Sequence, residues 1–327
     1  MIFLTGGAGF IGSNLLAALS DRGSDVAIAD FMGQDDKWRN VAKHAVAAFV
    51  DVDGTLDWLD ARAPLIESVV HLGAISSTTE RDVDKIVALN VRYTLSLWDW
   101  CTNNGKPFIY ASSAATYGDG SQGFDDDGDT AALARLRPLN PYAWSKHVVD
   151  RRIARLQAVT APTPPQWVGL KFFNVFGPNE YHKGDMRSIA CKVFEAIAEN
   201  RTVSLFRSAR SDYADGEQCR DFVYVKDCVD VLLWLLATPS VSGLFNVGTG
   251  KARSFLDLAS AVFQAVGRQP DIDFVDMPKD LAGRYQYFTE AAMTRLVAAG
   301  YTAPMTPLEG AVEDYVTSYL SQPDPYR

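Results

Sequence analysis

The chain has 327 residues and a formal net charge of −9, with 47% hydrophobic and 22% charged residues. A chain of this length and composition can bury a large core, which excludes intrinsic disorder, and its acidic balance supplies no basic field for a nucleic acid. It has no run of 18 apolar residues, no basic cluster at its start and no CxxC pair among its 4 cysteines, so we expect a cytoplasmic protein without a membrane span, disulfide framework or metal site.

The first half of the chain alternates short apolar runs with helical patterns. We expect strands at residues 2–5, 26–29, 47–50, 68–72, 108–111 and 168–173, and helices at 12–22, 83–103 and 142–157. Strands that alternate with helices predict an α/β protein with a Rossmann-type, doubly wound parallel sheet. Because the strands are continuously apolar, we expect helices on both faces of that sheet.

The alternation of strands and helices becomes less regular after residue 177. We expect helices at 186–199, 226–237, 255–266 and 307–320, and short strands at 203–206, 222–225, 244–247 and 271–275. This pattern predicts a smaller, mixed α/β lobe. We therefore divide the chain into a dinucleotide-binding domain at 1–170 and a mainly substrate-binding lobe at 171–327, with the chain crossing back to the first domain.

A glycine turn directly follows the first strand and opens the first helix. Gly6, Gly9 and Gly12 have the spacing GxxGxxG, and Asp30 ends the second strand. Glycine permits the tight turn and the close approach of a pyrophosphate, the helix N-terminus attracts the anion, and an acid at this distance suits a ribose hydroxyl. The segment predicts a nicotinamide dinucleotide site.

The choice between NAD and NADP is open at this point. Asp30 favours the free 2′-hydroxyl of NAD, whereas Lys37 and Arg39 follow within ten residues and could hold the 2′-phosphate of NADP. One well-placed cation could outweigh the preference of Asp30 for NAD. A contact at 4 Å between a cation and the 2′-phosphate is worth about 4 kcal/mol before desolvation, at an effective dielectric constant near 20.

A second motif has the form YxxxK, with Tyr142 and Lys146 on one face of a helix. We expect the ammonium of Lys146 to favour the phenolate of Tyr142 and lower its pKa. Ser113 ends the fifth strand at the carboxyl edge of the sheet, where doubly wound sheets bind ligands. A serine there could hydrogen-bond a substrate hydroxyl beside the tyrosine.

These motifs, together with TGGAGFIG and RDFVYV, resemble the extended short-chain dehydrogenase/reductases, which include nucleotide-sugar epimerases and dehydratases. Further segments are similar to the ADP-L-glycero-D-manno-heptose 6-epimerase family: SSTTERD (76–82), YASSAATYG (110–118), FFNVFGPNEYHKGDM (172–186), FNVGTG (245–250) and GRYQYFT (283–289). The resemblance implies interconversion of two ADP-heptose epimers by transient oxidation at C6 with bound NAD(P), for the heptose of the lipopolysaccharide core. It also implies a homo-oligomer, of which a pentamer is one form.

The resemblance implies roles for individual residues. Tyr142 and Lys183 are the two acid/base groups, which suits an inversion in which the hydroxyl oxygen is placed differently in the two epimers. Lys146 binds the cofactor, and Ser113 touches the substrate. Further cofactor contacts are Phe10, Ile11, Asp30, Phe31, Lys37, Leu72, Gly73, Ala74, Ile75, Ser76, Asn90, Val175 and Lys183. Substrate contacts are Ser113, Asn174, Lys183, Asp185, Lys192, Phe206, Arg207, Ser208, Ala209, Arg220 and Tyr285.

The sequence departs from the family pattern at three cofactor positions. Phe31 stands where asparagine is frequent, and Val52 and Asp53 stand near a basic position. We expect NADP, with NAD as the alternative. Other nucleotide-sugar enzymes of the same fold, such as a UDP-hexose 4-epimerase, and a regulatory protein without catalysis are the alternative functions. Alanines after Ser113 argue against a dehydratase, and an intact Ser113, Tyr142 and Lys146 argue against a regulatory protein.

Overall fold

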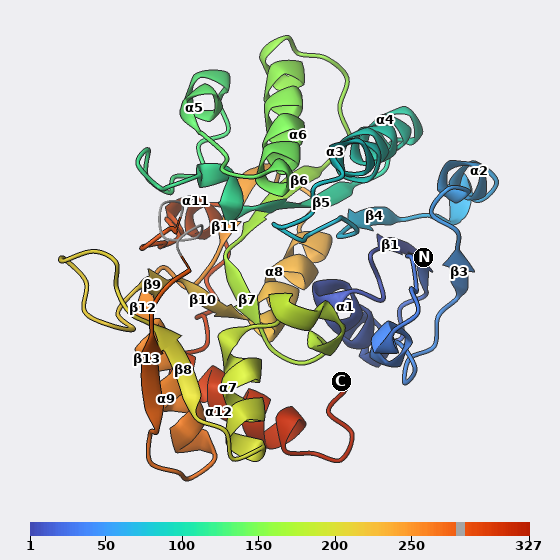
Figure 1. Ribbon diagram of the computed structural model, residues 1–327. Helices are drawn as coiled ribbons and strands as arrows, with labels where there is room; N and C mark the ends of the chain where they lie inside the picture. Colours follow the sequence, from blue (N-terminus) through green and yellow to red (C-terminus); the bar gives the residue numbers. More distant parts are fainter. Residues whose placement is uncertain (279–284) are drawn as a thin grey trace.

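Seven parallel strands form the central sheet of the computed structural model, which describes residues 1–278 and 285–327 (Figure 1). Their order is β11-β6-β5-β4-β1-β2-β3. The strands are β1 (Ile2–Thr5), β2 (Val26–Ala29), β3 (Ala48–Val50), β4 (Ser68–His71), β5 (Phe108–Ser113), β6 (Trp167–Phe172) and β11 (Gly243–Val247). The predicted Rossmann-type class is confirmed, and the strand order reverses between β1 and β4, where such sheets open a crevice for a ligand.

Helices cover both faces of this sheet, as the continuous apolar strands predict (Figure 1). On one face, α1 (Phe10–Asp21) and α8 (Val225–Ala237) pack leucines and valines against the inner side chains of β1, β2 and β6. On the other face, α4 (Tyr93–Asn104) and α6 (Pro141–Ala158) bury Trp98 and Val149 against Phe3 and Phe108. Burial of this apolar surface is the main force that holds the layers together.

The helix predicted at 83–103 is continuous but not uniform. It runs through α3 (Val83–Ile86), a π-helical segment η3 (Val87–Arg92) and α4. Asn90 lies in η3 and is fully buried. Helix α6 begins at Pro141 because Asn140 caps it by accepting a hydrogen bond from the Ala143 N–H at 2.9 Å.

A second lobe has its own core beside the sheet (Figure 1). It contains α7 (Ile189–Ala198), α9 (Phe255–Ala265), α12 (Leu308–Tyr315) and η6 (Val316–Leu320). Three two-stranded pairs complete it: β8 (Val203–Phe206) with β13 (Ile272–Val275), β7 (Asn174–Phe176) with β10 (Phe222–Tyr224), and β9 (Cys219–Arg220) with β12 (Arg253–Ser254). The remaining short elements are η1 (Asp36–Asn40), α2 (Thr55–Asp60), η2 (Ala63–Leu65), η4 (Ala114–Tyr117), α5 (Thr130–Arg135), η5 (Tyr181–Met186) and α11 (Thr294–Ala298).

Two elements of the second half differ from the sequence-based expectation. The strand expected in the smaller lobe at 244–247 is β11, which pairs in parallel with β6 at the edge of the central sheet. The helix expected at 186–199 begins only at Ile189, because the Ser188 side chain caps it and accepts a hydrogen bond from the Cys191 N–H. Long-range strand pairing and a cap decide these two positions, and neither is visible in local periodicity.

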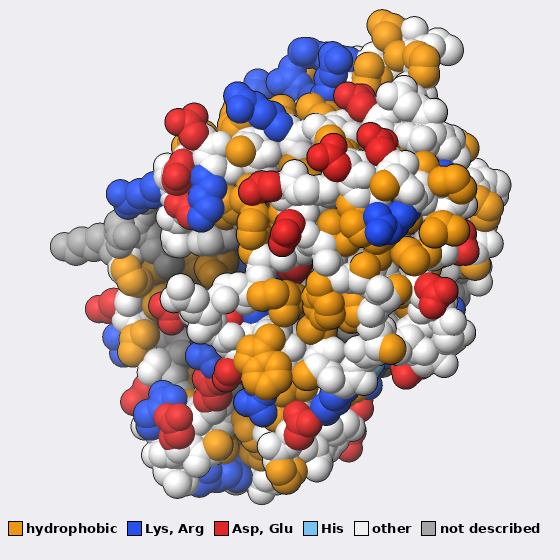
Figure 2. Space-filling view, turned by 90° about the vertical axis from the view of Figure 1, so that its right-hand side faces the viewer, with side chains coloured by type: hydrophobic (Ala, Val, Ile, Leu, Met, Phe, Trp, Pro, Cys, Tyr) orange, Lys and Arg blue, Asp and Glu red, His pale blue; other side chains and the backbone are white. Residues whose placement is uncertain are grey.

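Charges of both signs are interspersed with apolar side chains over most of the face shown in Figure 2. Within the described part of the chain, no helix has the length and apolar character needed to cross a bilayer.

A buried ion pair lies beneath the carboxyl ends of β5 and β6. Lys171 Nζ is 2.8 Å from Asp150 Oδ2, and both side chains are fully buried. Asp150 also accepts hydrogen bonds from Ser112 Oγ at 2.7 Å and from Tyr110 OH at 3.0 Å, while Lys171 donates to Thr116 Oγ1. This network fixes the strand end that carries Ser113.

We expect Lys171→Met to lower the free energy of unfolding by about 3–5 kcal/mol, because it leaves the Asp150 carboxylate buried and unpaired. Urea unfolding of the variant measures this loss. Lys226→Met is the matched control, since Lys226 pairs with Asp314 at a half-exposed position and its loss costs about 1 kcal/mol or less. Equal losses for the two variants would contradict the assignment.

Candidate active site

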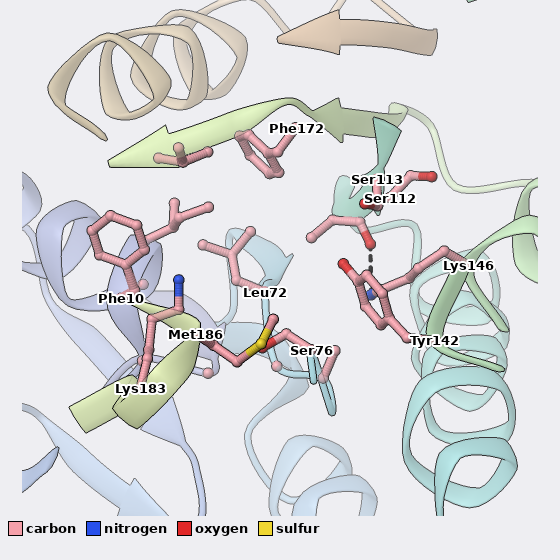
Figure 3. A pocket seen from close by; sticks show the side chains of 18 of the residues that line it. Phe10, Leu72, Ser76, Ser112, Ser113, Tyr142, Lys146, Phe172, Lys183 and Met186 are labelled. Atoms are coloured by element: carbon pink, nitrogen blue, oxygen red, sulfur yellow. Dashed lines mark hydrogen bonds between the residues drawn. The ribbon is translucent and has the colours of Figure 1, made fainter. Parts of the chain in front are cut away.

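A cavity of about 310 Å³ lies at the crevice predicted by the strand order. Its wall combines the glycine turn, the ends of β2, β4 and β5, the start of α6 and the η5 segment (Figure 3). The predicted residues that line it are Gly6, Gly9, Phe10, Ile11, Gly12, Asp30, Lys37, Leu72, Gly73, Ala74, Ser76, Ser113, Tyr142, Lys146, Val175 and Lys183. Residues that lie far apart in the chain, from Gly6 to Lys183, therefore meet at one place.

The glycine turn is built for close backbone contact. Gly6 has a φ of +68°, and a Cβ there would lie 2.5 Å from the Gly73 nitrogen. A Cβ on Gly12 would lie 2.0 Å from the Gly6 carbonyl oxygen. Gly9 precedes α1 without a side-chain cap, so the first N–H groups of this helix face the cavity and suit an anionic pyrophosphate.

Asp30 and Lys37 form a pair at the end of β2. The carboxylate accepts a hydrogen bond from the Ala8 N–H at 2.9 Å, and Lys37 Nζ donates to its other oxygen at 2.7 Å. Lys37 also donates to the Phe31 carbonyl. Arg39, the other cation considered for a 2′-phosphate, pairs with Asp36 and lies over the Tyr326 ring instead.

A smaller cavity of about 120 Å³ adjoins this pair and is lined by apolar and aromatic side chains. Phe31, Val52, Ile75 and Tyr93 are among them, which gives a flat aromatic base a hydrophobic setting. Asn90 lines neither cavity. Its side chain accepts from the Ile75 N–H at 2.8 Å and donates to the Ile75 carbonyl at 2.9 Å, so it fixes the segment that does line them.

Ser113, Tyr142 and Lys146 lie together on one side of the first cavity, the one of about 310 Å³ (Figure 3). Burial raises the pKa of Tyr142, and a hydrogen bond with Ser113 opposes this rise. Burial lowers the pKa of Lys146 to about 8, with Asp150 opposing. Contrary to our expectation, Lys146 is not among the groups that lower the pKa of Tyr142, and its Nζ donates to the Ala111 carbonyl oxygen at 2.7 Å.

Lys183 lies across the cavity from Tyr142 (Figure 3). Its ammonium is 4.9 Å from the centre of the Phe10 ring, which places it beside the N-terminus of α1. Burial lowers the pKa of Lys183, and Glu180 opposes this shift. The cavity thus has an ionisable group on each of two opposite sides.

A second cavity of about 670 Å³ shares Ser113, Tyr142, Phe172 and Phe173 with the first. Asn174 and Arg220 line it, as predicted for substrate contacts. Arg220 is 7% exposed, and its guanidinium lies over the Tyr285 ring at 5.1 Å and the Phe255 ring at 5.5 Å. Arg220 donates to the Cys219 carbonyl, and its other N–H groups suit an anionic ligand.

The other residues predicted to contact substrate lie outside both cavities. Tyr285 reaches the site through Arg220, and Phe206 packs edge-on against Tyr285 at 6.4 Å. Lys192 donates to the Asp185 carbonyl at 2.6 Å. The 207–209 stretch is held from within its loop, where the Ser208 N–H donates to Asp215, and from outside it, where the Ala209 N–H donates to Tyr287 OH. Of the GRYQYFT segment, residues 283–284 lie outside the described residues.

Several cavity residues were not assigned a role from the sequence. Thr78, Thr79, Glu80 and Arg81 line the second cavity, and Met186 lines the first. The first four belong to the SSTTERD segment, which follows β4 at the same carboxyl edge as Ser113. That position on the sheet is the signal that could have indicated them.

His71 and His182 lie in different environments, one in the core and one in the cavity wall. The two ring nitrogens of His71, within β4, lie 2.6 Å from Thr5 Oγ1 and 2.8 Å from Thr94 Oγ1, so this imidazole is a packed core group. His182 lines the first cavity, and burial lowers its pKa to about 4. Within residues 1–278 and 285–327, no three histidine, cysteine or acidic side chains are arranged to hold a metal ion.

The model of the NAD dependent epimerase/dehydratase family matches residues 2–248. The chain belongs to this family. Two similar relatives are named ADP-L-glycero-D-manno-heptose-6-epimerase: that of Nitratidesulfovibrio vulgaris strain DP4 is 48% identical and that of Fusobacterium nucleatum 45% identical, each over 100% of both chains. The shared length includes the second lobe, which the family model covers only in part.

Solved structures of the epimerase family have the same fold. The ADP-L-glycero-D-manno-heptose-6-epimerase of Helicobacter pylori has a TM-score of 0.78 at 26% identity, over 97% of this chain and 95% of that one. The UDP-glucose 4-epimerase of Thermus thermophilus, in complex with NAD, has a TM-score of 0.74 at 25% identity, over 97% of this chain and 99% of that one. The family and these neighbours support a nicotinamide cofactor for this chain.

Proposed function

We propose that the protein interconverts ADP-D-glycero-D-manno-heptose and ADP-L-glycero-D-manno-heptose by transient oxidation at C6, and that it supplies heptose for the lipopolysaccharide core. This proposal depends on one observation: two cavities meet at Ser113 and Tyr142, and Lys183 lies across the first cavity from Tyr142. The full-length similarity to relatives named for this reaction supports the substrate.

The first cavity and the apolar pocket beside it fit a nicotinamide dinucleotide. The N–H groups at the start of α1 would bind its pyrophosphate, and Asp30 with Lys37 would bind the adenosine ribose. Lys146 would bind near the nicotinamide ribose. When bound, the dinucleotide supplies a reversible hydride acceptor for C6. The predicted contacts at Phe31, Ile75 and Val175 surround this space.

We assign the two proton transfers to Tyr142 and Lys183. The C6 hydroxyl must lose its proton as C6 becomes a transient ketone. Its oxygen must regain a proton, in a different position, when C6 is reduced on its opposite face. Tyr142 is positioned by Ser113 on one side, and Lys183 extends over Phe10 from the other. Burial of Lys183 lowers its pKa toward the range in which an amine exchanges protons readily.

The second cavity would hold the nucleotide sugar. Arg220 would bind the diphosphate, and Asn174 and Ser113 would bind sugar hydroxyls. Tyr285 and Phe206 extend the Arg220 end of the cavity as aromatic surfaces for the nucleotide. We keep Asp185, Lys192, Arg207, Ser208 and Ala209 as substrate contacts that require movement of their loops. We also propose a homo-oligomer, which light scattering after gel filtration would test.

The function is tested by incubating the purified protein with either ADP-heptose epimer and following the product by proton NMR. We expect the same mixture of the two epimers from both starting compounds. UDP-glucose and UDP-galactose are the comparison substrates. Interconversion of these sugars with no change in ADP-heptose would overturn the proposal in favour of a 4-epimerase.

We expect the apo-protein to bind NADP more tightly than NAD. Lys37 donates to Asp30, the residue that we propose for the adenosine ribose, and a phosphate could draw its ammonium away from Asp30. Calorimetric titration with each dinucleotide measures the preference. Lys37→Met should weaken NADP binding by more than it weakens NAD binding. Tighter binding of NAD to the unaltered protein would instead identify Asp30 as the dominant determinant.

A further inference from the structure

A fully buried carboxylate, that of Glu180, lies directly before the segment that carries Lys183. Glu180 Oε1 accepts hydrogen bonds from the Gly177 N–H at 3.3 Å and from Ser188 Oγ at 2.7 Å. Its other oxygen accepts from the Ser188 N–H. Gly177 and Ser188 are the two ends of the segment that contains η5, so one side chain joins both ends of the loop.

The carboxylate also connects this loop to two helices of the second lobe. Tyr315 OH, at the end of α12, is 3.1 Å from Glu180 Oε1. Ser188, which donates to Glu180, caps α7 through the Cys191 N–H. Two backbone N–H groups can only donate, and with both hydroxyls donating as well they match an ionised carboxylate, which can only accept.

We propose that Glu180 is a positioning residue for Lys183: its carboxylate fixes both ends of the loop that carries Lys183 and supplies the negative charge that holds the Lys183 ammonium in the cavity. The inference rests on the proposed function, in which Lys183 transfers a proton. Glu180 itself touches neither cavity, and none of the motifs in the sequence assigns it a role.

The charge arrangement around Lys183 supports this role. The titratable groups around its ammonium are Glu180 at the start of its loop, Cys191 of α7, His182 beside it, and Asp30, Lys37, Tyr142 and Lys146 in the wall of the cavity. Burial raises the pKa of Cys191 to about 12, and burial lowers that of His182 to about 4, so both are neutral near neutral pH. Asp30 is paired with Lys37 at 2.7 Å. Burial raises the pKa of Glu180, and Lys183 and the hydrogen bonds from Ser188 and Gly177 oppose that rise. In its ionised form Glu180 is the anion that opposes the loss of the Lys183 proton.

The test is Glu180→Gln, which removes the charge and offers donors where the loop already supplies donors. We expect kcat to fall by about 10²-fold, as for a small misplacement of a reacting group, while the KM for ADP-heptose changes little. A second readout does not depend on activity. Trace acetylation with acetic anhydride over a range of pH, followed by peptide mass spectrometry, reports when each lysine loses its proton. Lys183 should titrate at lower pH in Glu180→Gln than in the unaltered protein, while the exposed Lys251, outside this loop, should not shift.

Asp227→Asn is the matched control. Asp227 is a buried carboxylate that accepts hydrogen bonds from the Thr306 N–H at 2.9 Å and from Thr306 Oγ1 at 2.7 Å, away from both cavities. It should lower the melting temperature without moving the Lys183 titration. If Glu180→Gln does not fold, Glu180→Asp serves instead: it keeps the charge but shortens the reach, so kcat should fall while the Lys183 titration stays in place.

Glu180→Gln with an unchanged Lys183 titration would overturn the proposal, even if kcat and stability fall, because a purely structural role predicts that result. For Glu180→Asp, full retention of kcat or a Lys183 titration that moves would overturn it. Failure of the proposed function gives a different pattern. The unaltered protein would then leave ADP-heptose unchanged, while acetylation would still report whether Glu180 controls the Lys183 proton.

Discussion

Tyr142→Phe is expected to fold and bind the dinucleotide normally and to lose epimerisation by about 10²–10⁴-fold in kcat, the usual cost of removing a positioned acid or base. The phenolic hydroxyl is the only group removed, and the ring still lines both cavities. Steady-state turnover of either ADP-heptose epimer measures the effect. Turnover within about threefold of the unaltered protein would remove Tyr142 from its role.

Ser113→Ala is the informative companion to this variant. Burial raises the pKa of Tyr142, and the hydrogen bond from Ser113 opposes that shift. Without the serine hydroxyl the phenol should hold its proton to higher pH, so the basic limb of the kcat profile should move toward higher pH. A phenol whose ionisation does not respond to Ser113 would show that another group sets its proton affinity.

Lys183→Met is expected to lower kcat strongly with only a modest change in KM. An acid/base group acts in the transition state, whereas a phosphate anchor binds ground state and transition state equally and mainly affects KM. Because burial lowers the pKa of Lys183, its ionisation should appear in the pH profile below the ordinary lysine range. Lys183→Met should lose that ionisation, and Tyr142→Phe should retain it.

Lys192→Met is the comparison variant for a lysine that only helps to bind the substrate. Lys192 donates to the Asp185 carbonyl and extends toward the loop rather than into a cavity. We expect it to raise KM with little change in kcat. If Lys183→Met gives this same pattern, the mechanism with two proton-transfer groups fails, and Tyr142 must serve both orientations of the intermediate.

The sequence was most informative where local pattern determines structure. The glycine turn after β1, the serine at the end of β5 and the spacing of Tyr142 and Lys146 all lie at the sheet edge that the alternation of strands and helices predicts. These features depend on a few neighbouring residues and on one rule of parallel sheets. The same rule would have placed Thr78 to Arg81 in the second cavity.

Pairing between distant residues could not be predicted in the same way. Lys146 donates to the Ala111 carbonyl rather than acting on Tyr142, and Lys37 pairs with Asp30. The Lys171–Asp150 pair joins residues of α6 and β6, and the role of Glu180 depends on Ser188 and Tyr315. A charged residue in a sequence shows neither its burial nor its partner, so these contacts required the folded chain.

The wall shared by the two cavities has a consequence for the order in which ligands exchange. Ser113, Tyr142 and two phenylalanines line both a compartment suited to the dinucleotide and one suited to the nucleotide sugar, so the two compartments meet at these residues. If each ligand occupies its own compartment, the sugar nucleotide can exchange through the second cavity without displacing the dinucleotide from the first. Because epimerisation restores the dinucleotide to its starting redox state, one resident molecule can serve many successive turnovers, and the enzyme need not draw on the cellular pool between them.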